Sequence, residues 1–513
     1  MDSKQRIKEE FTYYLSNIAR SSRRTDKGFN LQPTAVQSFL AFLEVDRLFD
    51  YKPEIWKHIK SMYDITVPNE VENIADTLLN DEEFAKHDND KNQGWRSGSI
   101  IHYVCFIKAR SYFMNEKTKD FSETPDQKTA NKVTSGVQYS TYRPYITAIK
   151  SKPFLLLAGI SGTGKSRIVR ELARACWEEG TDEYKAQKPK NFQMVQVKPN
   201  WHDSSDLIGY VSRVSGKAEF VAGEFLKFIA KAWEDVETPY FLCLDEMNLA
   251  PVEQYFAEYL SVIESRKSHE EGTITTDPIL EKSAEDWYRV LTSELTNEDN
   301  VRNRFLEEGI CIPQNLIVVG TVNMDETTFS FSRKVLDRAM TIEMNEVDLY
   351  GGLTDRNEHI GKLGKAELIG YAVEGVDVYA ANKDVCEMVL KYLEAVNEVL
   401  EGTPFKVAYR TRNDFLLYVV NNLPYNKGEN DEELPQGYVV ARALDEITSM
   451  KILSRIEGDD TKVSDNFLDS LSKTVEEGLK AVSGEENAVK SISLAKLKEM
   501  KDKLVSGYTS FWS

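Results

Sequence analysis

Glycine, lysine and serine residues occur together between residues 159 and 166 in a spacing that suits phosphate binding. The segment reads Gly-Ile-Ser-Gly-Thr-Gly-Lys-Ser, and it lies between an apolar run and an amphipathic run. Glycines let backbone amides turn toward phosphate oxygens at the start of a helix. A lysine at this spacing neutralises the β- and γ-phosphate oxygens, and a serine hydroxyl is a ligand of Mg²⁺. We therefore predict a phosphate-binding loop. Its assigned residues are Gly159, Gly162, Thr163, Gly164, Lys165 and Ser166.

Two acids end a later apolar run. Residues 240–246 read Tyr-Phe-Leu-Cys-Leu-Asp-Glu, which predicts a buried strand that ends in Asp245 and Glu246. Parallel strands present ligand-binding side chains at their carboxyl ends, so the two acids should lie near the loop. We predict that Asp245 holds Mg²⁺, directly or through water, and that Glu246 orients and deprotonates the attacking water. Without the loop, an ordinary solvated strand end would explain the two acids equally well.

A third apolar run, at 315–323, ends in Asn323. An asparagine there can reach between the γ-phosphate and the water, and a plain strand-end asparagine is the alternative. Arg338 follows in the segment Ser-Arg-Lys-Val-Leu-Asp-Arg. We predict that Arg338 acts on the γ-phosphate of a neighbouring subunit, which stabilises charge only when a ring forms. The competing interpretation is an intramolecular salt bridge between Asp337 and an arginine.

Two more arginines, Arg410 and Arg412, open a helical pattern near the C-terminus. We expect one of them to contact the γ-phosphate from a helical lid and to couple the lid angle to hydrolysis. The sequence does not choose between the two, and a solvated helix start is the alternative for either.

The elements that must position these residues alternate between short apolar runs and amphipathic segments from about residue 152 to 345. Such alternation is typical of a parallel sheet flanked by helices. A charged insertion interrupts it at about 266–309, where Trp287 and Tyr288 are candidate contacts for DNA or a partner. A peripheral solvated insertion is equally compatible with the pattern. From about residue 380 the pattern becomes helical. The predicted fold class is α/β, with a C-terminal helical lid and a separate all-helical N-terminal domain.

The 513 residues suffice for about three domains. We predict a helical recognition domain at 1–114, a polar linker at 115–138, an α/β nucleotide-hydrolysing core at 139–350 and a helical lid at 351–513. No apolar run approaches the roughly 18 residues of a membrane span. The charged start lacks the apolar core of a secretory signal. We expect a cytoplasmic protein that does not contact a membrane.

The five cysteines are scattered and form no CxxC pair, so neither a disulfide framework nor a zinc site is expected. Cys176 falls on a helical pattern and Cys243 within an apolar run. Both are expected to be buried thiols that pack as small hydrophobic side chains.

The net charge of −19 arises after the first domain, because basic and acidic residues balance over residues 1–145. This distribution disfavours bulk adhesion to nucleic acid and leaves the neutral first domain as the less repelled place for a polyanion. A basic cluster there supplies candidate phosphate contacts, with a solvated surface as the alternative. The candidates are Arg20, Arg23, Arg24, Lys27 and Arg96.

Four segments together resemble the McrB family of AAA+ proteins, over about residues 140–460. They are the loop at 159–166, PNWHDSSDLIGY at 199–210, DEMNLAPVEQYFAEYLSVIES at 245–265 and TVNMDETTFSFSRKVLDRA at 321–339. The resemblance gives the same residues family roles: Lys165 and Ser166 bind phosphate and magnesium, Asp245 and Glu246 form the Walker B pair, Asn323 is the signature asparagine, and Arg338 acts in trans.

The resemblance also implies a biological role. Members of the family are motor subunits of modification-dependent restriction systems: hexameric rings that hydrolyse GTP, or ATP in some relatives, with Mg²⁺. They act with a separate McrC-like nuclease subunit. Their first domain varies and commonly selects modified DNA or another target, so the resemblance implies a sensor at 1–114 without naming its ligand. We find no nuclease motif in this chain, which assigns cutting to such a partner. The segment 322–327 departs from the family's MNTADR signature, and no NKxD-type element follows the loop, so the choice between GTP and ATP stays open.

Two other function classes share this chemistry. A protein-remodelling chaperone of the MoxR type would act on a polypeptide, whereas a nucleotide-gated scaffold would hydrolyse slowly and signal by assembling. Stimulation of hydrolysis by DNA favours the restriction motor over the chaperone. The intact pair of Asp245 and Glu246 disfavours the scaffold.

Overall fold

The chain divides into two units, Met1–Thr129 and Ala130–Ser513, which are described separately. The computed structural model describes Phe11, Ile100, Tyr103 and residues 141–269, 272–324, 329–345, 349, 360–428 and 432–512. In the first unit, Phe11, Ile100 and Tyr103 are buried, and the rings of Phe11 and Tyr103 meet edge to face at 5.2 Å. The rest of the predicted recognition domain and the predicted linker lie outside the described residues, so the domain boundaries stay predictions.

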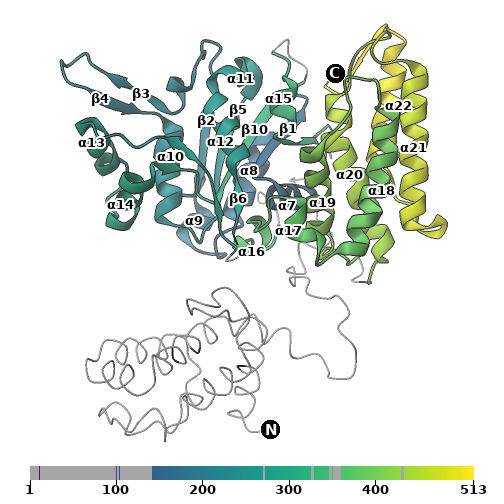
Figure 1. The fold of residues 1–513 in the computed structure, drawn as a ribbon, viewed down its shortest axis with the longest axis horizontal. Coiled ribbons are helices and arrows are strands. Elements are labelled where there is room, and N and C mark those ends of the chain that lie inside the picture. Colours follow the sequence, from purple (N-terminus) through teal and green to yellow (C-terminus); the bar gives the residue numbers. More distant parts are fainter. Residues whose placement is uncertain are drawn as a thin grey trace, which may run out of the picture. The chain divides into compact units, whose positions relative to one another are not determined.

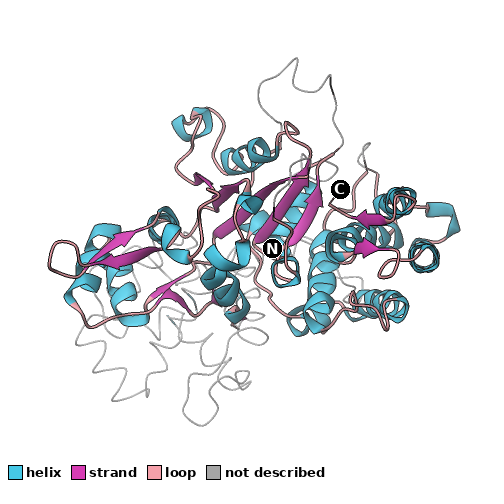
Figure 2. Ribbon diagram, turned by 90° about the horizontal axis from the view of Figure 1, so that it is seen from above, coloured by secondary structure: helices cyan, strands magenta, loops and turns pink. Residues whose placement is uncertain are grey.

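The second unit is built on a five-stranded sheet in which every pairing is parallel (Figure 1). The strand order is β11-β1-β10-β5-β2. The bounds are Phe154–Gly159 for β1, Phe192–Gln196 for β2, Tyr240–Asp245 for β5, Leu316–Asn323 for β10 and Met340–Glu343 for β11. Helices lie on both sides of this sheet (Figure 2). The prediction of an α/β fold with a parallel sheet flanked by helices is confirmed.

The strands are apolar at consecutive positions because both faces of the sheet are covered. Side chains alternate between faces along a strand. In β1, Leu155 and Leu157 therefore join one hydrophobic cluster, whereas Phe154 and Leu156 join the other. Cys243 of β5 is fully buried in the first cluster, as expected for a thiol that packs as a hydrophobic side chain.

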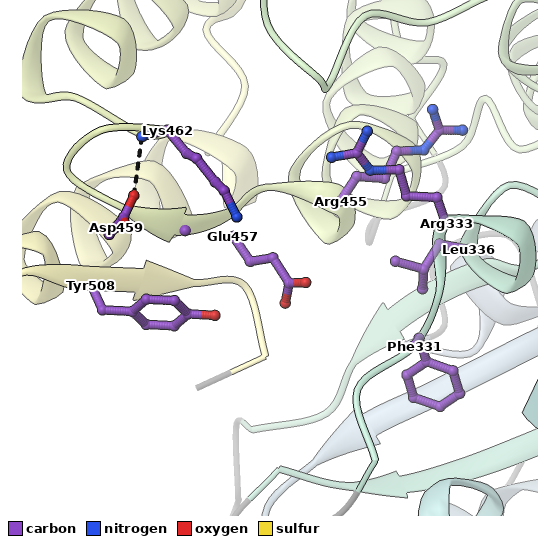
Figure 3. Close-up of a pocket in the computed structure, with 9 residues that line it drawn as sticks. Phe331, Arg333, Leu336, Arg455, Glu457, Asp459, Lys462 and Tyr508 are labelled. Carbon is purple, nitrogen blue, oxygen red and sulfur yellow. Dashed lines mark hydrogen bonds between the residues drawn. The ribbon is translucent and has the colours of Figure 1, made fainter. Parts of the chain in front are cut away.

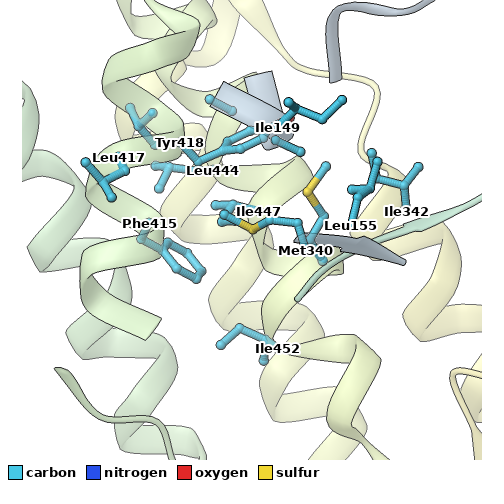
Figure 4. Packing of buried hydrophobic residues seen from close by; sticks show 14 of the residues in the cluster. Ile149, Leu155, Met340, Ile342, Phe415, Leu417, Tyr418, Leu444, Ile447 and Ile452 are labelled. Atoms are coloured by element: carbon cyan, nitrogen blue, oxygen red, sulfur yellow. The ribbon is translucent and has the colours of Figure 1, made fainter. Parts of the chain in front are cut away.

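The first cluster runs without a break from the sheet into the C-terminal helices. Leu155 and Met340 of the sheet belong to the same cluster as Ile149 of α7, Phe415 of α19 and Ile447 of α20 (Figure 4). The predicted C-terminal helical region is confirmed. Its helices are α16 Lys365–Leu368, α17 Gly375–Tyr379, α18 Lys383–Val399, α19 Tyr409–Asn422, α20 Gln436–Lys451, α21 Asp465–Ser483 and α22 Ile492–Leu504, and the hairpin of β12 Glu457–Asp459 and β13 Tyr508–Ser510 completes it.

The remaining elements cover the two faces of the sheet or extend from its edges. The helices are α7 Arg143–Ser151, α8 Lys165–Arg174, α9 Asp182–Lys185, α10 Glu224–Glu234, α11 Val252–Tyr255, α12 Ala257–Val262 and α15 Arg333–Leu336. Short antiparallel pairs join β3 Gly209–Ser212 to β4 Glu219–Ala222 and β6 Lys267–Ser268 to β7 Ile274–Thr275. Within the described residues, no helix combines the length and apolar character that a bilayer crossing requires.

The insertion contains α13 Asp286–Leu295 and α14 Asp299–Glu308, which are flanked by the paired strands β8 Pro278–Leu280 and β9 Ile310–Cys311. Tyr288 is fully buried, and its hydroxyl donates to the carbonyl of Phe305 at 2.7 Å. Trp287 stacks on Phe220 of β4 with ring centroids 5.3 Å apart. These two aromatic residues hold the insertion together and fix it to the β3–β4 hairpin. Tyr288 is buried within the insertion, whereas Trp287 is partly exposed and stays a candidate contact for DNA or a partner.

A buried ion pair anchors α7 to the C-terminal helices. Nη1 of Arg143 donates to Oε2 of Glu446 at 2.9 Å, and the Tyr418 hydroxyl donates to the same oxygen at 2.8 Å. Arg143 and Glu446 are both less than 10% exposed. Since α7 leads directly into β1, this pair also fixes the start of the sheet relative to α19 and α20.

We predict that Arg143→Ala lowers the free energy of unfolding by about 3–5 kcal/mol, because it leaves the Glu446 carboxylate buried without its cation. Urea denaturation of the purified chain measures the effect. Lys480→Ala is the matched control, since it removes an exposed ion pair with Glu476 and should change the free energy by less than about 1 kcal/mol. An Arg143→Ala effect as small as that of the control would contradict the anchoring role.

Candidate nucleotide site

Three strands of the sheet end side by side at one edge. Gly159 at the end of β1 is in register with Asn323 at the end of β10, and β10 also pairs with β5, which ends in Asp245. The carboxyl edge of an open parallel sheet is the usual place for a ligand site. The topology therefore brings the loop at 159–166, the two acids and the asparagine to a common edge.

The loop at 159–166 depends on left-handed glycines. Gly162 and Gly164 have φ of 87° and 82°, and Gly164 is the N-cap of α8. Only glycine adopts such conformations without a steric penalty. The Lys165 side chain is buried, and its ammonium donates to the carbonyls of Gly159 at 2.9 Å and Ile160 at 2.7 Å. The positive end of the α8 dipole and the lysine charge thus meet within the loop.

Residues after β11 support the first turn of this loop. The amide of Ile160 donates to Oδ1 of Asn345 at 3.0 Å. A Cβ added at Gly159 would lie 2.6 Å from the carbonyl of Met344, so no larger residue fits there. Asn345 was not among the residues predicted from the sequence. Its signal was similar to that of Asn323, because Asn345 is a polar residue two positions after the end of a strand.

Ser166 and Asp245 lie in contact. Oγ of Ser166 donates to Oδ1 of Asp245 at 2.6 Å. The hydroxyl of Thr321 donates to the same carboxylate oxygen at 2.9 Å. Hydroxyl and carboxylate oxygens are the hard ligands that Mg²⁺ prefers, and this cation keeps several waters when few protein ligands are present. The donor set at the edge of the sheet therefore fits a magnesium ion next to the phosphate-binding loop.

Glu246 adopts a backbone conformation that is rare for a residue with a side chain. Its φ of 54° and ψ of 52° are left-handed, and among the described residues no other non-glycine has a positive φ. Such a conformation costs about 1–2 kcal/mol, and it persists where the surroundings enforce it. The Glu246 amide donates to the Thr321 hydroxyl at 3.0 Å, and Oε1 accepts from Nδ2 of Asn323 at 3.1 Å. Two residues of β10 thus hold the strained acid.

Thr321 is a second residue of this site that was not predicted from the sequence. Its hydroxyl donates to Asp245 and accepts from the amide of Glu246, so it links the two acids. The signal was present, because residues two apart on a strand share a face and Asn323 had already been assigned. A hydroxyl residue at position 321 was read only as part of an apolar run.

Two of the three predicted arginines, Arg338 and Arg410, lie in an ionic cluster between the end of α15 and the helical region. Arg338 is ion-paired with Glu264, and its Nε and Nη1 donate to the carbonyls of Leu260 and Lys334, each at 2.8 Å. Arg410 is ion-paired with Glu264 and, at 3.3 Å, with Asp337. The alternative of a salt bridge at Asp337 is therefore present, with Arg410 and Arg455 as its cations.

Arg412 faces a different environment. Its guanidinium donates to Oδ1 of Asn413 and lies over the ring of Tyr409, 5.0 Å from the centroid. Tyr409 is 77% exposed, so this pair lies at the surface. The structure thus separates the two arginines that the sequence left equivalent, since only Arg410 joins the cluster that contains Arg338. The candidate DNA contacts Arg20, Arg23, Arg24, Lys27 and Arg96 lie outside the described residues.

Comparison with known proteins agrees with this geometry. Residues 154–339 match the AAA domain of the dynein-related subfamily. This part of the chain is an AAA+ domain. Residues 370–507 match a domain of unknown function, DUF8727.

The chain is also similar to a protein of Escherichia coli (strain K12) described as the "Type IV methyl-directed restriction enzyme EcoKMcrB subunit". The two are 24% identical over 213 residues, which cover 42% of this chain and 39% of that protein. The match thus spans well under half of the relative's length. This similarity agrees with the resemblance to the McrB family that the sequence motifs carry.

We predict that Thr321→Val lowers turnover or apparent Mg²⁺ affinity about 10- to 100-fold, the usual effect of removing a residue that orients a ligand. Valine keeps the shape but cannot donate to Asp245 or accept from Glu246. Titration of nucleotide hydrolysis with Mg²⁺ measures both quantities. Thr321→Ser is the control, because it keeps the hydroxyl and should stay close to the wild type. Wild-type Mg²⁺ dependence and turnover of Thr321→Val would contradict the linking role.

Proposed function

We propose that this chain is the nucleotide-hydrolysing ring subunit of a McrBC-like DNA restriction system in antiviral defence. The observation that carries the proposal is the continuous set of hydrogen bonds from Ser166 through Asp245 and Thr321 to Glu246 and Asn323. It joins the end of the phosphate-binding loop to a carboxylate that can activate water. The sequence similarity to the McrB subunit supports the choice of system.

The loop at 159–166 binds the triphosphate of GTP or ATP in this proposal. Lys165 exchanges its two backbone carbonyls for phosphate oxygens, and the amides at the start of α8 face the phosphates. Ser166 and Asp245 hold Mg²⁺, which when bound neutralises charge on the β- and γ-phosphate oxygens. Asn345 keeps the first turn of the loop in place through the amide of Ile160.

Glu246 is the residue that prepares the attacking water. Its carboxylate accepts from Asn323 and its amide is held by Thr321, so the acid is oriented before a nucleotide arrives. A positioned carboxylate takes a proton as the water attacks, and a positioned amide orients that water near the γ-phosphate. Such preorganisation lowers the barrier because little rearrangement remains for the reaction itself.

Ring assembly and DNA selection complete the proposal. Arg338 acts on the nucleotide of the neighbouring subunit of a hexameric ring, and Arg410 senses the nucleotide of its own subunit. The first domain, 1–114, selects DNA. The E. coli relative is described as methyl-directed, which makes DNA with modified bases the first target to test. A separate McrC-like nuclease subunit cuts the DNA.

We predict that the wild-type chain hydrolyses GTP or ATP and that methylated DNA with the nuclease subunit increases the rate. Lys165→Ala should lose nucleotide binding, whereas Glu246→Gln should bind nucleotide and lose hydrolysis, because only the proton acceptor is removed. Release of phosphate from each nucleotide, with and without methylated DNA, measures these effects. Lys480→Ala, an exposed lysine of α21, is the matched control and should keep wild-type turnover.

Several outcomes would contradict the proposal. Wild-type hydrolysis by both Lys165→Ala and Glu246→Gln would remove the assigned site. Hydrolysis that responds to an unfolded polypeptide and not to DNA would favour the MoxR-type chaperone. Assembly that depends on nucleotide but proceeds without appreciable turnover would favour the scaffold.

A further inference from the structure

One carboxylate connects two arginines that come from different parts of the second unit. Glu264 follows α12 of the AAA+ domain, and its side chain is ion-paired with Arg338, located just after α15, and with Arg410, located in α19. The Glu264 side chain is 29% exposed and the Arg338 side chain 14% exposed. We propose that Glu264 is a positioning residue for nucleotide hydrolysis, which holds Arg338 and Arg410 as one unit.

Glu264 and two backbone carbonyls fix the guanidinium of Arg338. Nε and Nη1 donate to two backbone carbonyls, and Glu264 lies 3.3 Å from Nε. Burial lowers the pKa of Arg338 and the Glu264 carboxylate opposes this shift. The carboxylate therefore keeps a desolvated guanidinium charged and in one orientation.

Removal of the Glu264 charge would leave the two arginines facing each other. Arg410 also lowers the pKa of Arg338, the effect expected of a like charge nearby. Without the carboxylate between them, the two guanidinium groups repel each other, and Arg338 loses its fixed orientation. A small displacement of a catalytic group is enough to reduce a rate by about 100-fold.

Further contacts join the helical region to the turn after α15. The ammonium of Lys451 donates to the carbonyls of Leu336, Asp337 and Ala339 at 2.8–3.1 Å. Arg455 reaches Asp337 from a small polar cavity that it lines with Arg333, Glu457 and Lys462 (Figure 3). Lys451 thus holds the backbone and Arg455 holds the Asp337 carboxylate, whereas Glu264 contacts the side chain of Arg338 itself. A change in the angle of the helical region is therefore transmitted to Arg338 through Glu264.

The inference rests on the proposed function, in which Arg338 acts on the nucleotide of the neighbouring subunit and Arg410 senses the nucleotide of its own subunit. Lys165→Ala and Glu246→Gln test that function without involving Glu264. A failure of the present inference therefore leaves the assigned hydrolysis site standing.

The test is a double-mutant cycle in the full chain with its activating DNA. We expect Glu264→Ala and Glu264→Gln to lower kcat about 10- to 100-fold with unchanged KM and unchanged affinity for a fluorescent nucleotide analogue. Because Glu264 acts through Arg338, the double variant Glu264→Ala/Arg338→Ala should be no slower than Arg338→Ala. Arg333 is the matched control on α15: its guanidinium donates to the carbonyl of Pro404, so its effect should multiply with that of Glu264→Ala. Glu476→Gln, which breaks an exposed ion pair, should keep the wild-type kcat.

Three results would overturn the inference. The first is a wild-type kcat for Glu264→Gln and Glu264→Ala while Arg338→Ala is slow. The second is a double variant in which the effects of Glu264→Ala and Arg338→Ala multiply. The third is a loss of nucleotide affinity and thermal stability in both Glu264 variants, which would make the role merely structural.

Discussion

A single carboxylate oxygen of Asp245 accepts hydrogen bonds from the last residue of the phosphate-binding loop and from the neighbouring strand. Ser166 and Thr321 both donate to it, at 2.6 and 2.9 Å. The contact requires β1, β10 and β5 to be neighbours and to end at the same edge of the sheet. The strand order and the pairing register meet both conditions. Directly after β5, the left-handed Glu246 donates its amide to the same Thr321 hydroxyl. The proposed magnesium ligands and the proposed water-activating acid are thus fixed by one small set of contacts.

Two kinds of contact join the helical region to the AAA+ domain. Apolar side chains pack it against the sheet, and ion pairs connect it to the turn after α15. A continuous hydrophobic cluster extends from the sheet to α19 and α20, and the buried pair of Arg143 and Glu446 fixes α7 against the same helices. At the end of α15, the carboxylates of Glu264 and Asp337 form ion pairs with arginines of both the AAA+ domain and the helical region. Apolar packing has no preferred direction, whereas ion pairs between specific side chains do. The charged cluster is therefore suited to report the position of the helical region to Arg338.

The sequence was sufficient for the fold class, because apolar runs on strands covered on both faces are easily distinguished from amphipathic helices. It also placed the loop, the two acids and Asn323 at strand ends, where the topology brings them together. Thr321 was missed because a hydroxyl inside an apolar run looks like ordinary strand content until its partners on β5 are known.

The pairing of Glu264 with Arg410 joins residues 146 positions apart, so no local pattern predicts it. Arg410 and Arg412 could not be separated from the sequence either, because the difference between them lies in which element each one faces. The left-handed backbone of Glu246 likewise depends on contacts with β10 rather than on its own residue type.

A structure determined with Mg²⁺ and a non-hydrolysable analogue of GTP or ATP tests the central claim most directly. The account predicts the phosphates within the turn of residues 159–166, the metal ion on the side of Ser166 and Asp245, and the γ-phosphate facing Glu246 and Asn323. Phosphates bound elsewhere, or a γ-phosphate that faces neither Glu246 nor Asn323, would contradict it.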